Sequence, residues 1–298
     1  MTSLWIFAAL GTAACFAISS LLAYDAAKAL GAVAFSFLRM TVVTAGFAVL
    51  IGIVGIDTSL NGSQVSLLAL SGVIGVFLAD SLRYSSLARI GPQLQSVLNT
   101  TTAPFALVLG GVFLGQYVGG FALLGTALVL AGLLIGIFAR SDAGPAPFVG
   151  VTGSATSGVA FGLASALAQA GSVLIAAPVM LDGVDLVTAT FVRSAAGSAS
   201  LLLPVVMSPR TRAQVKRLSR PIAKQVFLSA AIGTGLGMSL QLAALREGPV
   251  GVVAVLTSTT PLMILPMIWV LGRARPPIWA WLGALCAVIG VAFIVSGR

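Results

Sequence analysis

The sequence of 298 residues contains no histidine and only two cysteines, Cys15 and Cys286, which lie near opposite ends of the chain. Transition-metal sites in proteins rely on clustered histidine and cysteine ligands, so we expect no metal here and no other cofactor. The lack of histidine also removes the commonest general acid or base, and we expect no enzymatic activity. The two cysteines are interpreted as small packing residues.

Charged residues are also scarce, at 8% of the chain, whereas 58% of the residues are hydrophobic. A soluble domain has roughly a quarter of its residues charged, so this composition indicates an integral membrane protein. Stretches of about 20 apolar residues, the length that crosses a bilayer, occur ten times. The predicted spans are 4–24, 32–55, 65–87, 94–115, 118–138, 152–175, 186–207, 225–245, 250–271 and 277–296. No barrel-like alternation interrupts them, so the predicted fold class is all-α, with ten transmembrane helices.

The region around the fourth predicted span is repeated later in the chain. Residues 89–115 align with residues 246–272, and eight of the 27 aligned positions are identical. Equivalent residues flank this region at slightly different offsets, and they include Gly75 with Gly233, Gly132 with Gly290, and Arg39 with Arg193. The chain is therefore predicted to consist of two copies of one five-helix unit.

The two copies are expected at residues 1–140 and 151–298, joined by a linker at 141–150 that is rich in glycine and proline. Because each copy has an odd number of spans, the second copy enters the membrane from the opposite side and the repeats are inverted. Inverted repeats recur in secondary transporters, where the two halves enclose a site near the membrane midplane. We therefore expect a central cavity between the copies.

Two short motifs mark the fourth helix of each copy. They are GP at 91–92 and 248–249, and the threonine-rich steps TTTAP at 100–104 and TSTTP at 257–261. Together with the ten predicted helices, they resemble the EamA branch of the drug/metabolite transporter superfamily, over essentially the whole chain. The resemblance implies export or exchange of small metabolites, such as amino acids, through a central cavity. It also implies that helices one to four and six to nine line the path, while helices five and ten support it from outside.

Basic residues are divided unevenly between the two sides of the predicted bundle. Those in loops after odd-numbered spans are Lys28, Arg89, Arg140, Arg210, Arg212, Lys216, Arg217, Arg220, Lys224, Arg273 and Arg275, and those on the other side are Arg246 and Arg298. Cytoplasmic loops are enriched in lysine and arginine, so this count predicts both termini outside, whereas the resemblance implies both inside. The basic segment 208–224 is typical of contact with anionic lipids, and we expect a multi-pass protein of the cell (inner) membrane that binds no nucleic acid.

Four charged residues lie inside the predicted spans, namely Arg39, Asp80, Arg83 and Arg193. A charge that faces lipid is costly, so we expect these side chains to face the protein interior. Arg39 and Asp80 are predicted at the same depth, which favours a structural ion pair. Alternatively, Asp80 is a protonatable group that couples protons to transport. Arg83 is expected to extend toward the lipid headgroups.

Arg193 is the counterpart of Arg39, but the position equivalent to Asp80 is Met238, so no acid within the spans is available to Arg193. Either carbonyl and hydroxyl groups at helix breaks satisfy Arg193, or it contacts a carboxylate or phosphate of the substrate. The excess of positive charge favours a substrate that carries an anionic group.

Uncharged polar residues complete the predicted cavity. The candidates are Tyr84, Gln95, Asn99, Thr101, Gln169, Gln241 and Ser258. For the glutamines and the asparagine the alternative role is hydrogen bonding between helices, and for Thr101 and Ser258 it is stabilisation of the helix kinks at the prolines. Pro104, Pro261 and Pro266 are predicted to break helices and to free carbonyl groups for nearby hydroxyls or for a ligand.

These features predict a secondary transporter that moves small metabolites, amino-acid-like or otherwise amphiphilic or zwitterionic, across the membrane. The expected mechanism is alternating access, the expected direction is export, and protons are the candidate coupling ion. The alternative is a non-transporting membrane scaffold or receptor. A membrane-embedded enzyme is disfavoured because the spans contain no histidine and only one acid, Asp80.

Overall fold

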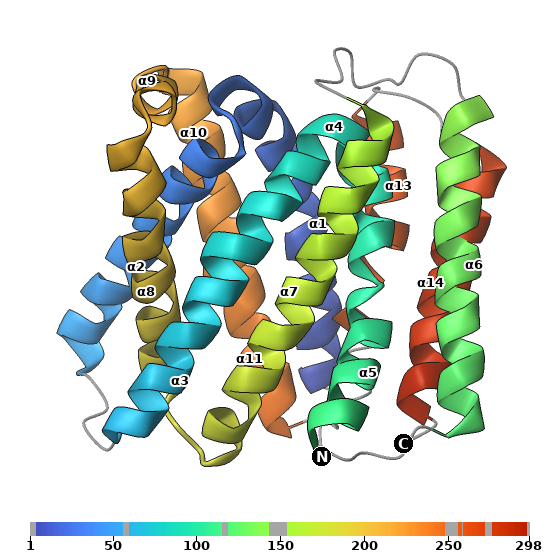
Figure 1. Cartoon of the computed structure of the whole chain (residues 1–298), viewed down its shortest axis with the longest axis horizontal. Coiled ribbons are helices and arrows are strands. Elements are labelled where there is room, and N and C mark those ends of the chain that lie inside the picture. Colours follow the sequence, from blue (N-terminus) through green and yellow to red (C-terminus); the bar gives the residue numbers. More distant parts are fainter. Residues whose placement is uncertain are drawn as a thin grey trace.

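The structure, a computed structural model, describes residues 4–55, 60–114, 119–142, 154–247, 256–257, 259–271 and 276–296. All regular elements in these residues are helices, in agreement with the predicted all-α class (Figure 1). The first part of the chain contains α1 (Leu4–Leu30), α2 (Ala32–Val54), α3 (Gly62–Gly72), η1 (Val73–Ala79), α4 (Asp80–Asn99), α5 (Thr102–Leu114) and α6 (Gly120–Asp142). The second part contains α7 (Ala155–Leu181), α8 (Leu186–Met207), α9 (Pro209–Val215), α10 (Arg220–Ser229), η2 (Ala230–Gly237), α11 (Met238–Glu247), α13 (Thr260–Val270) and α14 (Ile278–Ser296). Ser258 and most of the predicted linker, 143–150, lie outside the described residues.

Within the described residues, five helical stretches are long and apolar enough to cross a membrane, namely Leu4–Leu30, Ala32–Ile53, Gly62–Asn99, Ala155–Ala176 and Leu186–Met207. Shorter apolar helices lie at Leu123–Gly132, Thr260–Val270 and Ile278–Phe293. Many large apolar side chains are exposed, among them Phe7, Val49, Phe113, Phe121 and Val270. A monomer in water rarely exposes so much apolar surface, so the outside of this bundle is suited to lipid. The total of ten spans stays a prediction.

Two helix boundaries differ from those expected. The helix α1 continues past residue 24 to Leu30, because the alanine-rich sequence DAAKAL has a high helix propensity. Gly31, whose φ of 81° is unsuited to other residues, then separates α1 from α2. The basic segment 208–224, predicted as a loop, folds into α9 and the start of α10, and the Thr211 amide donates a hydrogen bond to the Ser208 hydroxyl that caps α9.

Two π-helical segments, η1 and η2, interrupt otherwise α-helical stretches at equivalent places in the two copies. Each contains one member of the glycine pair Gly75 and Gly233 that was matched in the sequence. The sequence analysis did not predict these segments. A π-helical turn is rare and is frequently found at functional sites, and residues of both segments line the cavity between the two copies.

The Gly-Pro turn predicted at residues 91–92 is present as a sharp bend within α4. Gly91 has φ 80° and ψ 167°, values that lie outside the helical region and that glycine tolerates best. Pro92 follows directly and lacks the amide hydrogen that would continue the helix. The two parts of α4 therefore run in different directions.

The threonine-rich steps end one helix and begin the next in both copies. In the first copy, the hydroxyls of Thr100 and Thr101 donate hydrogen bonds to the carbonyls of Val97 and Leu98 at 2.7 Å and 2.6 Å. Pro104 then lies in the first turn of α5. A proline is well tolerated there, because the first amides of a helix have no helical partner.

The second copy repeats this arrangement. The hydroxyls of Thr259 and Thr260 donate hydrogen bonds to the carbonyls of Leu256 and Thr257 at 2.7 Å and 2.8 Å. Pro261 lies in the first turn of α13, and Pro266 lies inside the same helix. The Thr257 carbonyl, which Pro261 leaves without its helical partner, is thus satisfied by the Thr260 hydroxyl.

The helices α6 and α14 pack side by side at one edge of the bundle (Figure 1). A Cβ atom added to Gly132 would lie 2.5 Å from the carbonyl oxygen of Gly283, and one added to Gly290 would lie 2.6 Å from that of Gly125. Only glycine allows backbones to approach this closely. Gly132, late in α6, thus contacts Gly283, early in α14, whereas Gly290, late in α14, contacts Gly125, early in α6. The two helices are therefore antiparallel.

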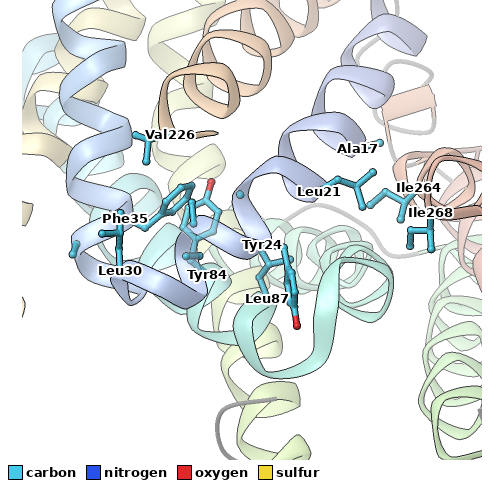
Figure 2. Close-up of a cluster of buried hydrophobic side chains, with 14 residues drawn as sticks. Ala17, Leu21, Tyr24, Leu30, Phe35, Tyr84, Leu87, Val226, Ile264 and Ile268 are labelled. Carbon is cyan, nitrogen blue, oxygen red and sulfur yellow. The ribbon is translucent and has the colours of Figure 1, made fainter. Parts of the chain in front are cut away.

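A buried hydrophobic cluster joins α1, α2 and α4 to α10 and α13 (Figure 2). At its centre the rings of Phe35 and Tyr84 meet edge to face, with centroids 4.6 Å apart. Val226, Ile264 and Ile268 contribute to the cluster from the second copy. The cluster therefore holds helices of the two copies together.

Candidate functional site

A cavity of about 390 Å³ lies between elements of the two copies. Its walls come from α1, α2, η1, α4 and α5 of the first copy and from α7, α8, η2, α11, α13 and α14 of the second. The predicted site residues that line it are Arg39, Asp80, Gln95, Asn99, Gln169, Arg193, Gln241 and Pro261. Among the described residues, α6 supplies no part of the lining and α14 supplies only Val291.

Two of the predicted cavity residues lie outside the lining. Tyr84 is buried in the hydrophobic cluster. The Cζ of Arg39 lies 5.5 Å from the centroid of its ring, so the two side chains form a cation–π contact. The hydroxyl of Thr101 is directed to the Leu98 carbonyl. The helix-break residues Pro104 and Pro266 also lie outside the lining.

Arg39 on α2 has protein partners for both ends of its guanidinium group. Its Nη1 lies 3.3 Å from the Asp80 carboxylate, and the two side chains are only 5% and 13% exposed. Its Nη2 donates a hydrogen bond to the Thr234 hydroxyl of η2, at 2.5 Å. A Cβ atom added to Gly233 would lie 3.0 Å from the same Nη2, so the arginine rests against the η2 backbone. The expected ion pair is therefore present, and it is extended by a contact to the other copy.

Arg193 on α8 occupies the equivalent position against η1, but none of the described carboxylates is its partner. Its Nη2 donates a hydrogen bond to the Ser172 hydroxyl at 3.2 Å and lies 3.6 Å from a Cβ atom added to Gly75. The Nε of Arg193 is buried without a hydrogen-bond partner in the described part of the chain. No acidic oxygen among the described residues lies within 4 Å of this guanidinium.

Each arginine lies beside serines that join the two copies. Ser19 of α1 donates a hydrogen bond to the Ser229 carbonyl at 2.9 Å. In the equivalent place, Ser71 and Ser172 donate to each other's carbonyls, both at 2.8 Å. These serines carried no signal in the sequence, because small hydroxyl residues are frequent in all membrane helices.

Arg83 is a correction to the sequence analysis. We expected it to extend to the lipid headgroups, but it lines the cavity and its Nη2 lies 3.4 Å from the Ser20 hydroxyl of α1. The described lining therefore contains three arginines and one acid, Asp80.

Three further polar atoms of the described lining residues are buried without a hydrogen-bond partner. They are the Nε of Arg39, the Oε1 of Gln95 and the Oγ1 of Thr102, all contributed by the first copy. Buried polar atoms in folded proteins are normally paired with protein or water. The cavity thus offers an unused acceptor and an unused hydroxyl as well as the unused Nε donors of Arg39 and Arg193.

Comparison with known proteins places this arrangement in a family. The model of the EamA-like transporter family matches residues 3–138 and again residues 156–296. The chain belongs to the EamA-like transporter family. This confirms the family predicted from the sequence, and the family is one of membrane transporters.

The fold is shared with a protein of known structure. A crystal structure superposes on the chain with a TM-score of 0.64 and 17% sequence identity, over 97% of each chain. At this level of identity the likeness concerns the fold alone. None of the curated proteins compared with the chain matches it.

Proposed function

We propose that this EamA-like protein is a secondary transporter that exports small amino-acid-like or other amphiphilic or zwitterionic metabolites by alternating access. The observation that supports this proposal best is the set of unpaired polar atoms around one cavity, which contains, besides Arg39 Nε, the atoms Arg193 Nε, Gln95 Oε1 and Thr102 Oγ1. Leaving a buried polar group unpaired costs about 1–3 kcal/mol. A solute that carries both a carboxylate and an ammonium or hydroxyl group offers partners to all three.

Alternating access requires two halves that can move against each other around the solute. The family model matches the chain twice, and the antiparallel packing of α6 against α14 relates equivalent helices in opposite directions. Both facts support ten spans arranged as inverted repeats. In this arrangement the cavity lies between the two copies, so rocking of one against the other exposes it to each side in turn.

The experiment is a transport assay with the purified protein in proteoliposomes. Vesicles are loaded with unlabelled amino acids, hydroxy acids or nucleosides, and the uptake of the labelled compound in exchange is measured. We expect counterflow for a solute with a carboxylate, and we expect Arg193→Ala to abolish it. Arg210→Ala, which changes an exposed arginine on α9, is the matched control and should leave the flux unchanged. Absence of flux for every solute with correctly folded protein in the vesicles contradicts the proposal.

A further inference from the structure

We infer that the Arg193 guanidinium binds a single carboxylate group of the transported solute. Met238 and Val76 set this specificity, because they stand where the other copy has an acid and a hydroxyl residue beside its arginine. The inference rests on the proposed function, because the solute enters the same cavity. It goes further in naming the chemical group, its position and the residues that make the position available.

The Arg39 site shows how this protein pairs a guanidinium with an acid inside the cavity, and the Nε of Arg39 is buried without a partner there as well. The Asp80 carboxylate lies 3.3 Å from one terminal nitrogen, and the Thr234 hydroxyl accepts a hydrogen bond from the other. Asp80 and Thr234 thus approach Arg39 from the two copies. This arrangement is an internal example of a carboxylate bound to an arginine inside the cavity.

The equivalent positions beside Arg193 are apolar. The offset of 158 residues that pairs Gly75 with Gly233 also pairs Asp80 with Met238, and it pairs Val76 with Thr234. The acid has therefore become a methionine and the hydroxyl residue a valine. Both replacements remove a hydrogen-bonding group from the neighbourhood of the second arginine.

The structure keeps these two residues in the same cavity as Arg193. Met238 and Val76 are both lining residues. Val76 contacts α8 at Gly197, one turn beyond Arg193, where an added Cβ atom would overlap the valine side chain. Beside Arg39, a carboxylate neutralises the guanidinium. The equivalent position beside Arg193 is lined by uncharged side chains.

Arg83 does not compete for the same role. It lies three residues after Asp80 on α4, so the only acid of the described lining is near both Arg39 and Arg83. Arg193 lies on α8 and has one hydrogen bond, to the neutral Ser172 hydroxyl. It is the arginine of the cavity whose charge is left for a ligand.

A carboxylate fits the remaining donors of Arg193. The Nε is buried and unpaired, and the planar guanidinium presents adjacent N–H groups that match the two oxygens of a carboxylate. One guanidinium carries one positive charge. A carboxylate, with one negative charge, neutralises it, whereas a phosphate ester with two negative charges would leave one charge without a partner. We therefore assign the subsite to a monoanionic carboxylate rather than to a phosphate ester.

The test compares acids with their neutral amides on the purified protein and on two variants. Met238→Asp gives Arg193 the internal carboxylate that Arg39 already has, and Met238→Asn is the matched neutral control. The probes are phenylalanine, glutamate and lactate, their carboxamides, and phosphoethanolamine, which carries a phosphate and no carboxylate and should give no stabilisation. The readout is the melting temperature as a function of probe concentration. Transport of the same probes is measured in proteoliposomes.

We expect at least one acid to raise the melting temperature of the native protein and of Met238→Asn, with no comparable effect of its amide. In Met238→Asp the apparent affinity for that acid should fall about tenfold or more, the scale of a lost charge-assisted hydrogen bond. Without ligand, Met238→Asp should also melt higher than Met238→Asn, because it neutralises a buried charge.

Several results overturn the inference. These are equal stabilisation by acids and amides, an unchanged affinity in Met238→Asp, or the absence of any acid effect together with equal melting of the two variants. If solutes are transported regardless of their carboxylate, the proposed transport function stands and this inference fails. If acids bind as expected but no solute crosses the vesicle membrane, the subsite stands and the transport proposal fails.

Discussion

The hydroxyl oxygens of Thr44 in α2 and Ser198 in α8 lie 3.0 Å apart, and each residue follows the arginine of its own copy, Arg39 or Arg193, by five positions. Equivalent residues contact each other only where a pseudo-twofold axis passes between them. The contact of α6 with α14 obeys the same symmetry, because Gly132 packs against Gly283 and their equivalents Gly290 and Gly125 pack against each other. This geometry supports the inverted repeat of the proposed transporter.

The contact between Thr44 and Ser198 is expected to stabilise the α2–α8 pair. We predict that Thr44→Val and Ser198→Ala each lower the free energy of unfolding by about 0.6 kcal/mol, the average for hydrogen bonds between membrane helices. Because both substitutions remove the same bond, the double variant should lose little more than either single variant. Unfolding in detergent measures this coupling, and strictly additive losses contradict it.

The ion pair of Arg39 and Asp80 is expected to be a structural requirement. Its side chains are almost completely buried, so Asp80→Asn leaves an uncompensated arginine and should destabilise the protein by on the order of 3 kcal/mol. The amount of folded protein in the membrane and its melting temperature measure this loss. If Asp80→Asn instead accumulates normally and its transport no longer responds to a pH gradient, Asp80 is a proton-coupling residue.

Gly75 is expected to tolerate no side chain. A Cβ atom there would overlap the Ser172 hydroxyl and lie 3.0 Å from the Ser172 Cβ, so Gly75→Ala should displace the serine that holds Arg193. We predict a loss of about 1–3 kcal/mol in stability together with reduced transport. Gly46→Ala is the control, because Gly46 lies in α2 with no atom within 4 Å of an added Cβ. That variant should be as stable as the native protein or more stable, by up to about 1 kcal/mol.

The basic residues predict the orientation in the membrane. Figure 1 shows both termini at one end of the molecule, opposite α9 and α10. These two helices carry Arg210, Arg212, Arg220 and Lys224, and Lys216 follows α9 directly. We therefore expect the α9–α10 end in the cytoplasm and both termini outside. A reporter that is active only in the cytoplasm should be active when inserted after Arg217 and inactive when fused after Arg298. The opposite pattern places the termini inside.

Features that depend on solvent or on local backbone chemistry were predicted well. The scarcity of charge and the apolar runs led to helices with an apolar exterior, and the bend at Gly91 and Pro92 was expected from the dipeptide alone. The repeat was visible because equivalent glycines, such as Gly132 and Gly290, must remain small where helices touch. Each of these properties follows from a few neighbouring residues or from the whole composition.

The partners of the polar side chains could not be derived in this way. Arg83 was expected at the lipid headgroups but lines the cavity, and Tyr84 was expected in the cavity but is buried in the hydrophobic cluster. The π-helical turns of η1 and η2 also had no signal, because a single extra residue in a helical turn leaves the hydrophobic pattern almost unchanged. The direction in which α4 presents its side chains depends on such a turn.

Composition and residue order thus specified a helical membrane protein made of two related halves, because lipid acts on every residue separately and each helix satisfies its own backbone. Which charges are paired was specified by packing between helices far apart in the chain. Arg39 donates a hydrogen bond to Thr234, which lies 195 residues later in the chain. Arg193 has no acidic partner among the described residues, because Met238 occupies the position equivalent to Asp80. Such contacts exist only after the halves have come together, since they depend on the relative position of whole helices.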